Sequence, residues 1–199
     1  MNVLALAAHP DDFEIGCFGT LALHIMNGDT VFGLILTGGE CGGDAEKRRQ
    51  ESVDACGLIH INVYFASFPD GKLKDDIDTI TFIDNFIKEH KIDVMYSPSI
   101  HERHQDHRNL GYAMATASRF VKEAYYFETT SSDGFSPQLF VDISKTIDLK
   151  NDAIKKHITQ DNKCYMDPTQ LEMIAQGRGF KLGKSNIPFE AFEVVKIMR

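Results

Sequence analysis

The 199-residue sequence lacks the features of several specialised classes of protein. No apolar run approaches the roughly 18 residues of a membrane-spanning helix, and the uncharged stretch 1–8 is too short for a signal peptide. The four cysteines form no CxxC pair, so we expect reduced thiols and a cytoplasmic protein. The net charge of −8 argues against nucleic acid or an anionic membrane as partner, because either requires a basic face.

The sequence also has no internal repeat, low-complexity tract or linker, and we therefore treat residues 1–199 as a single domain. Apolar runs alternate with helix-like segments. This alternation predicts an α/β protein in which helices cover both faces of a mostly parallel sheet, giving three layers. Strands are expected at 3–8, 30–36, 62–66, 92–96, 124–128, 139–143 and 189–197. Helices are expected at 12–26, 45–56, 76–90, 106–121, 147–158 and 169–176.

Two clusters of imidazole and carboxylate groups each follow a predicted strand: residues 9–12 (HPDD) and residues 101–107 (HERHQDH). Ligands of such sheets bind outside the carboxyl ends of the strands, so we expect the clusters to meet there. A catalytic zinc site needs about three protein ligands and an open position for water, and histidine with carboxylate suits it. The clusters therefore predict a metal-dependent hydrolase.

The two neighbouring aspartates of the first cluster should point in different directions. One can bind the metal while the other serves as general base toward the metal-bound water. A protonated His104 could stabilise the oxyanion or donate to the leaving amine. The structural alternative for Asp12 and Asp106 is that each only caps a helix, because aspartate is common at helix starts.

At these residues the chain resembles the PIG-L/LmbE-like family of zinc-dependent N-deacetylases. The family's AHPDD motif corresponds to residues 8–12, and its HxDH motif to residues 104–107. The resemblance implies a Rossmann-like fold and zinc on His9, Asp12 and His107. It also implies Asp11 as general base and His104 as the charged partner of the oxyanion. Two histidines and one carboxylate do not exclude Fe²⁺ or Mn²⁺ as the metal.

Other family patterns lie in register along the chain. The T-x-G-E loop is similar to residues 37–40, the R-x-x-E helix to residues 48–51, the DGxL loop to residues 70–73, and a late lysine-to-glutamine pattern to residues 150–160. We expect Arg48, Asp70 and Glu40 to bind substrate. The alternatives are a solvated helix face for Arg48, a turn for Asp70 and simple exposure for Glu40.

Together these features predict hydrolysis of an N-acetyl group on an amino sugar or an amino-sugar conjugate, with release of acetate. One alternative is an amidase for a larger conjugate of an amino sugar and a thiol. Another is a catalytically silent sugar- or metal-binding protein, against which the intact Asp11 argues. The sequence leaves open whether the small-molecule substrate carries a nucleotide, lipid or thiol, and whether the chain forms a homo-oligomer.

Overall fold

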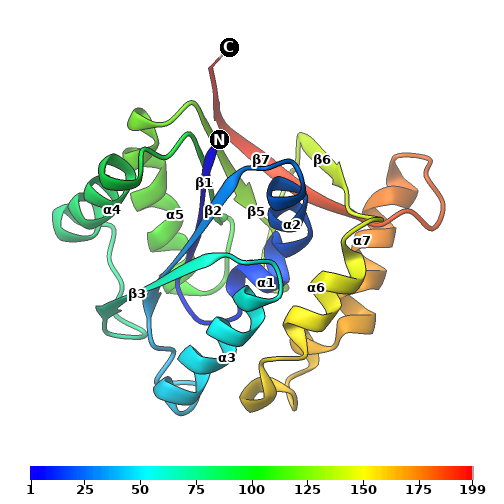
Figure 1. Cartoon of the computed structure of the whole chain (residues 1–199), viewed down its shortest axis with the longest axis horizontal. Helices are drawn as coiled ribbons and strands as arrows, with labels where there is room; N and C mark the ends of the chain where they lie inside the picture. Colours follow the sequence, from blue (N-terminus) through cyan, green and yellow to red (C-terminus); the bar gives the residue numbers. More distant parts are fainter. Residues whose placement is uncertain (199) are drawn as a thin grey trace.

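The computed structural model describes residues 1–198 and contains a seven-stranded sheet flanked by helices (Figure 1). The strands are β1 Asn2–Ala7, β2 Thr30–Thr37, β3 Asn62–Phe68, β4 Val94–Pro98, β5 Glu123–Phe127, β6 Leu139–Asp142 and β7 Phe189–Ile197. The helices are α1 Asp12–Gly16, α2 Phe18–Met26, α3 Ala45–Gly57, α4 Ile77–His90, α5 Gln105–Ala117, α6 Ile147–Ile154 and α7 Pro168–Lys181. Three short 3-10 segments are η1 Ser118–Phe120, η2 Ile158–Gln160 and η3 Cys164–Met166.

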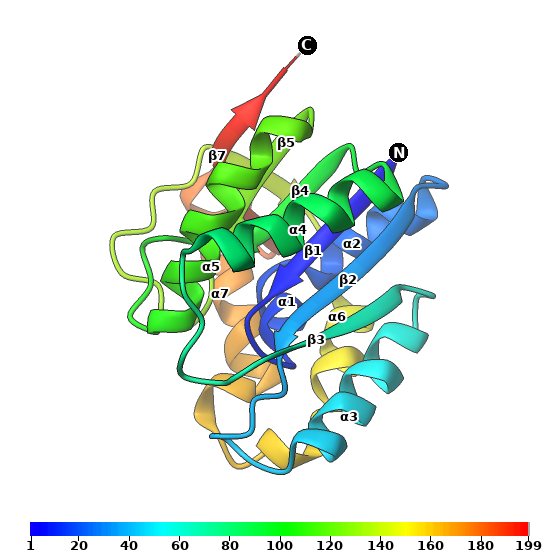
Figure 2. The same cartoon turned by 90° about the vertical axis from the view of Figure 1, so that its left-hand side faces the viewer.

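The strand order is β3-β2-β1-β4-β5-β7-β6. Strands β1 to β5 pair in parallel, whereas β7 runs antiparallel to both of its neighbours. The expected mostly parallel sheet is therefore confirmed, with one reversed strand near one edge. Because β1 and β2 are parallel neighbours, the loops that follow them leave the same edge of the sheet (Figure 2).

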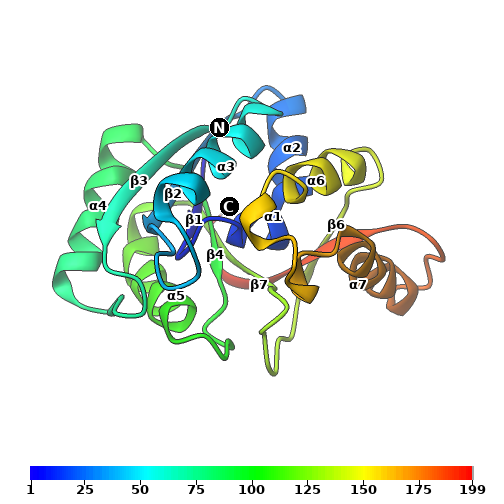
Figure 3. The ribbon, with the colours of Figure 1, turned by 90° about the horizontal axis from the view of Figure 1, so that it is seen from below.

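Side-chain alternation along β1 divides the core into two layers. Val3, Ala5 and Ala7 pack with residues of α1, α2, α3 and α6. Leu4 and Leu6 point to the opposite face and pack with residues of α4 and α5. Figure 3 shows these two groups of helices on opposite sides of the sheet, with α7 beside β7. The fold thus has the three layers that the sequence predicts.

The expected helix 12–26 is instead two helices, separated at Cys17, where φ is −147°. The physical reason is a distant carboxylate. Glu190 of β7 accepts hydrogen bonds from the amides of Gly19 (3.0 Å) and Thr20 (2.7 Å) in the first turn of α2. These amides need no partner in a preceding turn, so a new helix starts here. The helices expected at 106–121 and 147–158 end earlier, at Ala117 and Ile154, and the one expected at 169–176 runs on to Lys181.

All four cysteines are free in the structure, which agrees with the expected reduced thiols. Among residues 1–198, none of the helices combines the length and the apolar character that crossing a membrane requires.

Candidate metal centre and active site

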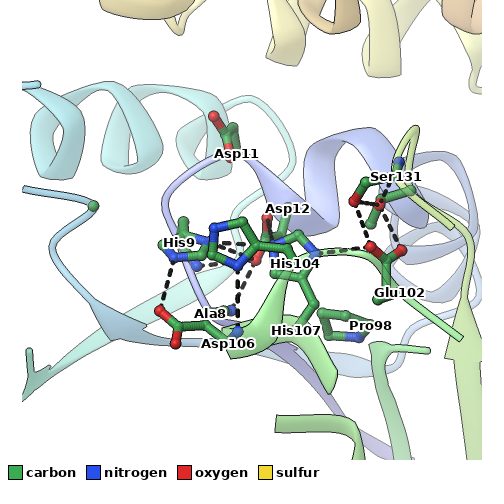
Figure 4. A network of polar contacts seen from close by, with 12 residues as sticks. Ala8, His9, Asp11, Asp12, Pro98, Glu102, His104, Asp106, His107 and Ser131 are labelled. Carbon is green, nitrogen blue, oxygen red and sulfur yellow. Dashed lines mark hydrogen bonds and ion pairs between the residues drawn. The ribbon is translucent and has the colours of Figure 1, made fainter. Parts of the chain in front are cut away.

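His9, Asp12 and His107 lie side by side at the carboxyl edge of the sheet (Figure 4). His9 and Asp12 follow β1, and His107 lies in the first turn of α5, which follows the neighbouring strand β4. His107 Nε2 is 3.2 Å from His9 Nδ1 and 3.1 Å from Asp12 Oδ1, and all three side chains are buried. The second carboxylate oxygen, Asp12 Oδ2, is 3.8 Å from His9 Nδ1. The three residues predicted to bind the metal are therefore brought together.

In each of the two imidazoles, the nitrogen that faces away from the other ring lies next to a carboxylate; we call it the outer nitrogen. His9 Nε2 is 2.9 Å from Asp70 Oδ1 and 3.4 Å from Asp106 Oδ2. His107 Nδ1 is 3.3 Å from Glu102 Oε2. When the outer nitrogens donate to these acceptors, the inner nitrogens direct lone pairs toward each other and toward Asp12. Two nitrogen lone pairs next to a carboxylate suit a divalent cation.

The charges around this point favour a cation. Burial alone would lower the pKa of His9, but hydrogen bonds to Asp106, Asp12 and Asp70 raise that pKa to about 12. Burial likewise opposes the charge on His107, whereas Asp12 and Glu102 raise its pKa to about 9. The pKa of Asp12 lies well below its usual range, because the two imidazoles outweigh the effect of its burial. Several carboxylates surround these two imidazoles. When both imidazoles are neutral, the site therefore carries an excess of negative charge, which favours a bound cation.

His104 lies at the rim of this centre and caps α5. Its Nδ1 accepts a hydrogen bond from the Asp106 amide at 3.3 Å, so the neutral ring carries its proton on Nε2. Its ring centroid is 4.7 Å from that of His9 and 4.8 Å from that of His107. Burial and the charges of His107 and His9 lower the pKa of His104. His104 and not Asp106 is the N-cap of α5, so the alternative that Asp106 only caps the helix is wrong. The expected protonated His104 stays a prediction.

Within residues 1–198, two groups of side chains place one ligand atom of each residue within 4.8 Å of the others: His9 with His104 and His107, and His9 with Asp70 and Asp106. Asp12 is in neither group, because it approaches the two imidazoles with different oxygens, Oδ1 toward His107 and Oδ2 toward His9. In the second group the carboxylates already have other donors. Asp70 Oδ2 accepts from the Cys41 amide at 2.8 Å, and Asp106 accepts from two backbone amides of the 71–73 turn. Asp70 and Asp106 therefore act as hydrogen-bond supports of His9.

Asp11 differs from the other carboxylates of the site. Its backbone has φ of 113°, which is strained for a residue with a side chain, and its carboxylate points away from Asp12 (Figure 4). Asp11 Oδ2 accepts from Arg48 Nη2 at 3.1 Å, and Oδ1 has no hydrogen-bond donor among the described residues. Burial and the charge of Asp12 raise the pKa of Asp11 to about 6, against the opposing effect of Arg48.

The structure gives the three predicted substrate-binding residues other contacts. Arg48 is buried, and its guanidinium donates to the carbonyls of Gly39 (2.7 Å) and Pro10 (2.8 Å) as well as to Asp11. The alternative of a solvated helix face for Arg48 is therefore wrong. Glu40 is exposed and accepts from the Asp70 amide at 2.8 Å, outside the described lining of the cavity. Arg48 and Asp70 do line the cavity.

A cavity of about 720 Å³ lies over these groups. Part of its lining comes from segments that follow β5 and α6, which sequence reasoning did not assign to the site. The lining residues missed in this way are Thr129, Thr130, Lys163 and Tyr165, whereas Ser131 begins a stretch expected to be either a flap beside the pocket or a plain connection, and Gln160 lies in the late family pattern. For Glu102 and Asp106 a signal was present, since both carboxylates lie in the same seven-residue cluster as two candidate histidines. The segment around Lys163 offered no comparable signal.

Comparison with known families decides the classification. The family model PIG-L, described as GlcNAc-PI de-N-acetylase, matches residues 4–118. The chain belongs to the PIG-L family. The uncharacterized deacetylase YaiS of Escherichia coli K12 is 30% identical to this PIG-L chain over 167 residues, covering 78% of this chain and 90% of YaiS.

Two solved structures show how widely the fold of this PIG-L chain is used. The N,N'-diacetylchitobiose deacetylase of Pyrococcus horikoshii superposes with a TM-score of 0.86 at 23% identity, covering 97% of this chain and 83% of that one. GalB, the 4-carboxy-2-hydroxymuconate hydratase of Pseudomonas putida KT2440, superposes with a TM-score of 0.85 at 19% identity, covering 100% and 97%. The Rossmann-like fold is thereby confirmed. Because a deacetylase and a hydratase share it, function has to be argued from the site.

Proposed function

We propose that this protein is a metal-dependent hydrolase that removes the N-acetyl group from an amino sugar or amino-sugar conjugate and releases acetate. The observation that carries the proposal is the convergence of His9, Asp12 and His107 in a cavity that is also lined by Asp11, whose Oδ1 has no hydrogen-bond donor among residues 1–198. The family description and the named activities of YaiS and the P. horikoshii enzyme support the deacetylation. The free thiols agree with a place in the cytoplasm.

In this proposal His9, Asp12 and His107 hold the metal, which we assign as Zn²⁺. When bound, it would polarise the acetyl carbonyl and acidify the attacking water. The choice of Asp12 over His104 as third ligand follows from burial, since Asp12 is enclosed and His104 is exposed. Asp12→Asn should lose metal, whereas His104→Asn should retain it. Metal analysis of the purified protein separates Zn²⁺ from Fe²⁺ and Mn²⁺.

The protein groups then divide the proton transfers. Asp11 Oδ1 takes a proton from the water that attacks the carbonyl carbon. His104 Nε2–H donates a hydrogen bond to the carbonyl oxygen as negative charge develops there. The proton held by Asp11 passes to the amide nitrogen as the C–N bond breaks, so acetate and a free amine leave. Arg48 keeps Asp11 in place through the 3.1 Å ion pair.

The decisive variant is Asp11→Asn, because asparagine keeps the shape and hydrogen bonding of the carboxylate but accepts no proton. We expect it to retain metal and to lose acetate release by roughly 10²- to 10⁴-fold. Asp78→Asn, at an exposed position of α4, is the matched control and should keep full activity. If Asp11→Asn released acetate at the wild-type rate, the assignment of the base would be wrong.

The substrate screen decides between the open alternatives. N-acetylglucosamine, N,N'-diacetylchitobiose and a larger amide of an amino sugar with a thiol conjugate are compared by the amine released. The cavity volume of about 720 Å³ is within the usual range for drug-sized ligands, so it admits the larger substrates. Tight metal binding without cleavage of any amide would favour the catalytically silent binding protein.

A further inference from the structure

One buried carboxylate contacts both the candidate metal centre and a wall of the cavity. Glu102 is 4% exposed and lies between His107 and the segment after β5 (Figure 4). Its Oε2 faces His107 Nδ1 at 3.3 Å and accepts from the Ser131 hydroxyl. Its Oε1 accepts from the hydroxyls of Thr129 (2.6 Å) and Ser132. We call residues 129–132 the hydroxyl loop.

The backbone ties the hydroxyl loop to the same place. Glu102 and Ser132 form an isolated antiparallel bridge, and the Arg103 amide donates to the Ser131 carbonyl at 3.1 Å. Thr129, Thr130 and Ser131 line the cavity. The side chain that orients a predicted metal ligand is therefore the side chain that holds a wall of the substrate cavity.

The contacts leave Glu102 little freedom. Glu102 accepts one hydrogen bond from an imidazole N–H and three from hydroxyl groups. Both of its oxygens are therefore occupied as acceptors. While His107 donates from Nδ1, its Nε2 lone pair must face His9 and Asp12. A tilt of this imidazole would move the carboxylate, and a move of the carboxylate would break hydroxyl contacts of the loop. The two ends of the network therefore share one set of hydrogen bonds.

A second buried carboxylate provides the contrast. Glu193 of β7 accepts from the Ser136 amide at 2.8 Å and from the Ser99 hydroxyl at 2.6 Å. It also contacts His101 Nδ1 at 3.0 Å. Glu193 thus anchors the chain just beyond the hydroxyl loop without contacting a predicted metal ligand. It separates the effect of loosening this region from the effect of releasing His107.

We propose that Glu102 is a positioning residue that couples metal binding at His107 to the order of the hydroxyl loop. The inference rests on the metal site of the proposed function, and it adds that metal binding at His107 increases the order of the hydroxyl loop. Coupling is reciprocal, so disordering the loop weakens metal binding by the same factor that metal loss loosens the loop.

The test uses the full chain, stripped of metal, and its Glu102→Gln and Glu193→Gln variants. Zn²⁺ affinity is measured by competition calorimetry, and hydrogen exchange of residues 129–132 is followed with and without Zn²⁺. Glutamine fills the same volume but has a single carbonyl acceptor. We expect Glu102→Gln to weaken Zn²⁺ binding roughly 10- to 100-fold and to abolish the Zn²⁺-dependent protection of the loop. Glu193→Gln should keep the wild-type affinity.

A second variant keeps the test informative if Glu102→Gln fails to fold. Thr129→Val combined with Ser131→Ala removes loop hydroxyls and leaves the contact between Glu102 and His107. It should lose the Zn²⁺-dependent protection. Wild-type Zn²⁺ affinity in Glu102→Gln, or loop exchange in the wild type that ignores Zn²⁺, would overturn the inference. Either result with acetate still released leaves the proposed function intact, whereas a wild-type protein that binds no metal defeats the proposed function itself.

Discussion

A buried ion pair joins Lys150 of α6 to Glu190 of β7, close to helices α1 and α2. Removing its lysine tests how much this pair contributes to the stability of the fold. Lys150 Nζ is 2.6 Å from Glu190 Oε1 and 2.6 Å from the carbonyl oxygen of Ile15. Both charged side chains are at most 4% exposed. Glu190 also caps the first turn of α2, so this pair connects α6 and β7 to the two helices that follow the HPDD cluster.

Lys150→Met removes the positive charge and leaves the Glu190 carboxylate buried. Breaking a buried pair in this way costs ~3–5 kcal/mol of unfolding free energy. The amides of α2 continue to donate to Glu190, which places the expected loss near the lower end, about 3 kcal/mol. With a urea m-value of about 2 kcal/mol/M, the unfolding midpoint should fall by about 1.5 M.

The measurement is equilibrium urea unfolding followed by circular dichroism, with a chelator present so that metal binding does not contribute. The double variant Lys150→Met/Glu190→Gln should be more stable than the single one, because the unpaired charge is gone. Lys155→Met is the surface control: its partner Asp152 lies 3.0 Å away, but both side chains are more than half exposed. A loss below about 1 kcal/mol in Lys150→Met, as for a surface pair, would refute the reasoning.

Two further predictions concern the loop and the base of the site. At Gly39, where φ is +65°, an added Cβ would lie 2.2 Å from Arg48 Nη1. Gly39→Ala should therefore displace the guanidinium and reduce acetate release. Gly57→Ala is the control, because a Cβ there meets open space, and it should leave acetate release unchanged. The buried Glu14 contacts His157 at 3.0 Å and, despite burial, raises the pKa of that imidazole. A raised histidine pKa stabilises the fold fully below the unfolded-state pKa of ~6.5, and this stability is lost as the pH rises through the folded-state pKa. The excess stability of the wild type over Glu14→Gln should therefore shrink as the pH rises above ~6.5. A pH-independent difference in urea unfolding would contradict this assignment.

The parts of the fold that the sequence predicted are those set by local pattern. Buried parallel strands are continuous apolar runs, and β1 is such a run. The convergence of His9 with His107 follows from a local motif together with one pairing, that of β1 with β4. Because parallel strands end at the same edge, polar residues after two such strands come together without any need to know the side-chain packing.

What the sequence did not reveal depends on contacts between distant segments. The break between α1 and α2 depends on Glu190, which lies far along the chain from Gly19. The charged residues around Arg48 have the pattern of a solvated helix face, yet its guanidinium reaches past the helix to Asp11. Periodicity predicts the helix face on which a residue lies, but it does not predict the direction in which a long side chain extends.

The distribution of hydrogen bonds among the acidic residues gives a reason to place the base at Asp11, independent of family membership. Asp70, Asp106 and Glu102 each use both carboxylate oxygens to accept from an imidazole or from a backbone or hydroxyl donor. Asp12 Oδ2 accepts from the amides of Ala8 and His9, and we assign Asp12 to the metal. A carboxylate held in this way orients its neighbours but has little capacity to accept a proton from water. Asp11 keeps one oxygen without a donor among residues 1–198 and lines the cavity. Since a fold shared with a hydratase does not specify the reaction, this free lone pair in the cavity over the candidate metal centre is the feature that favours hydrolysis.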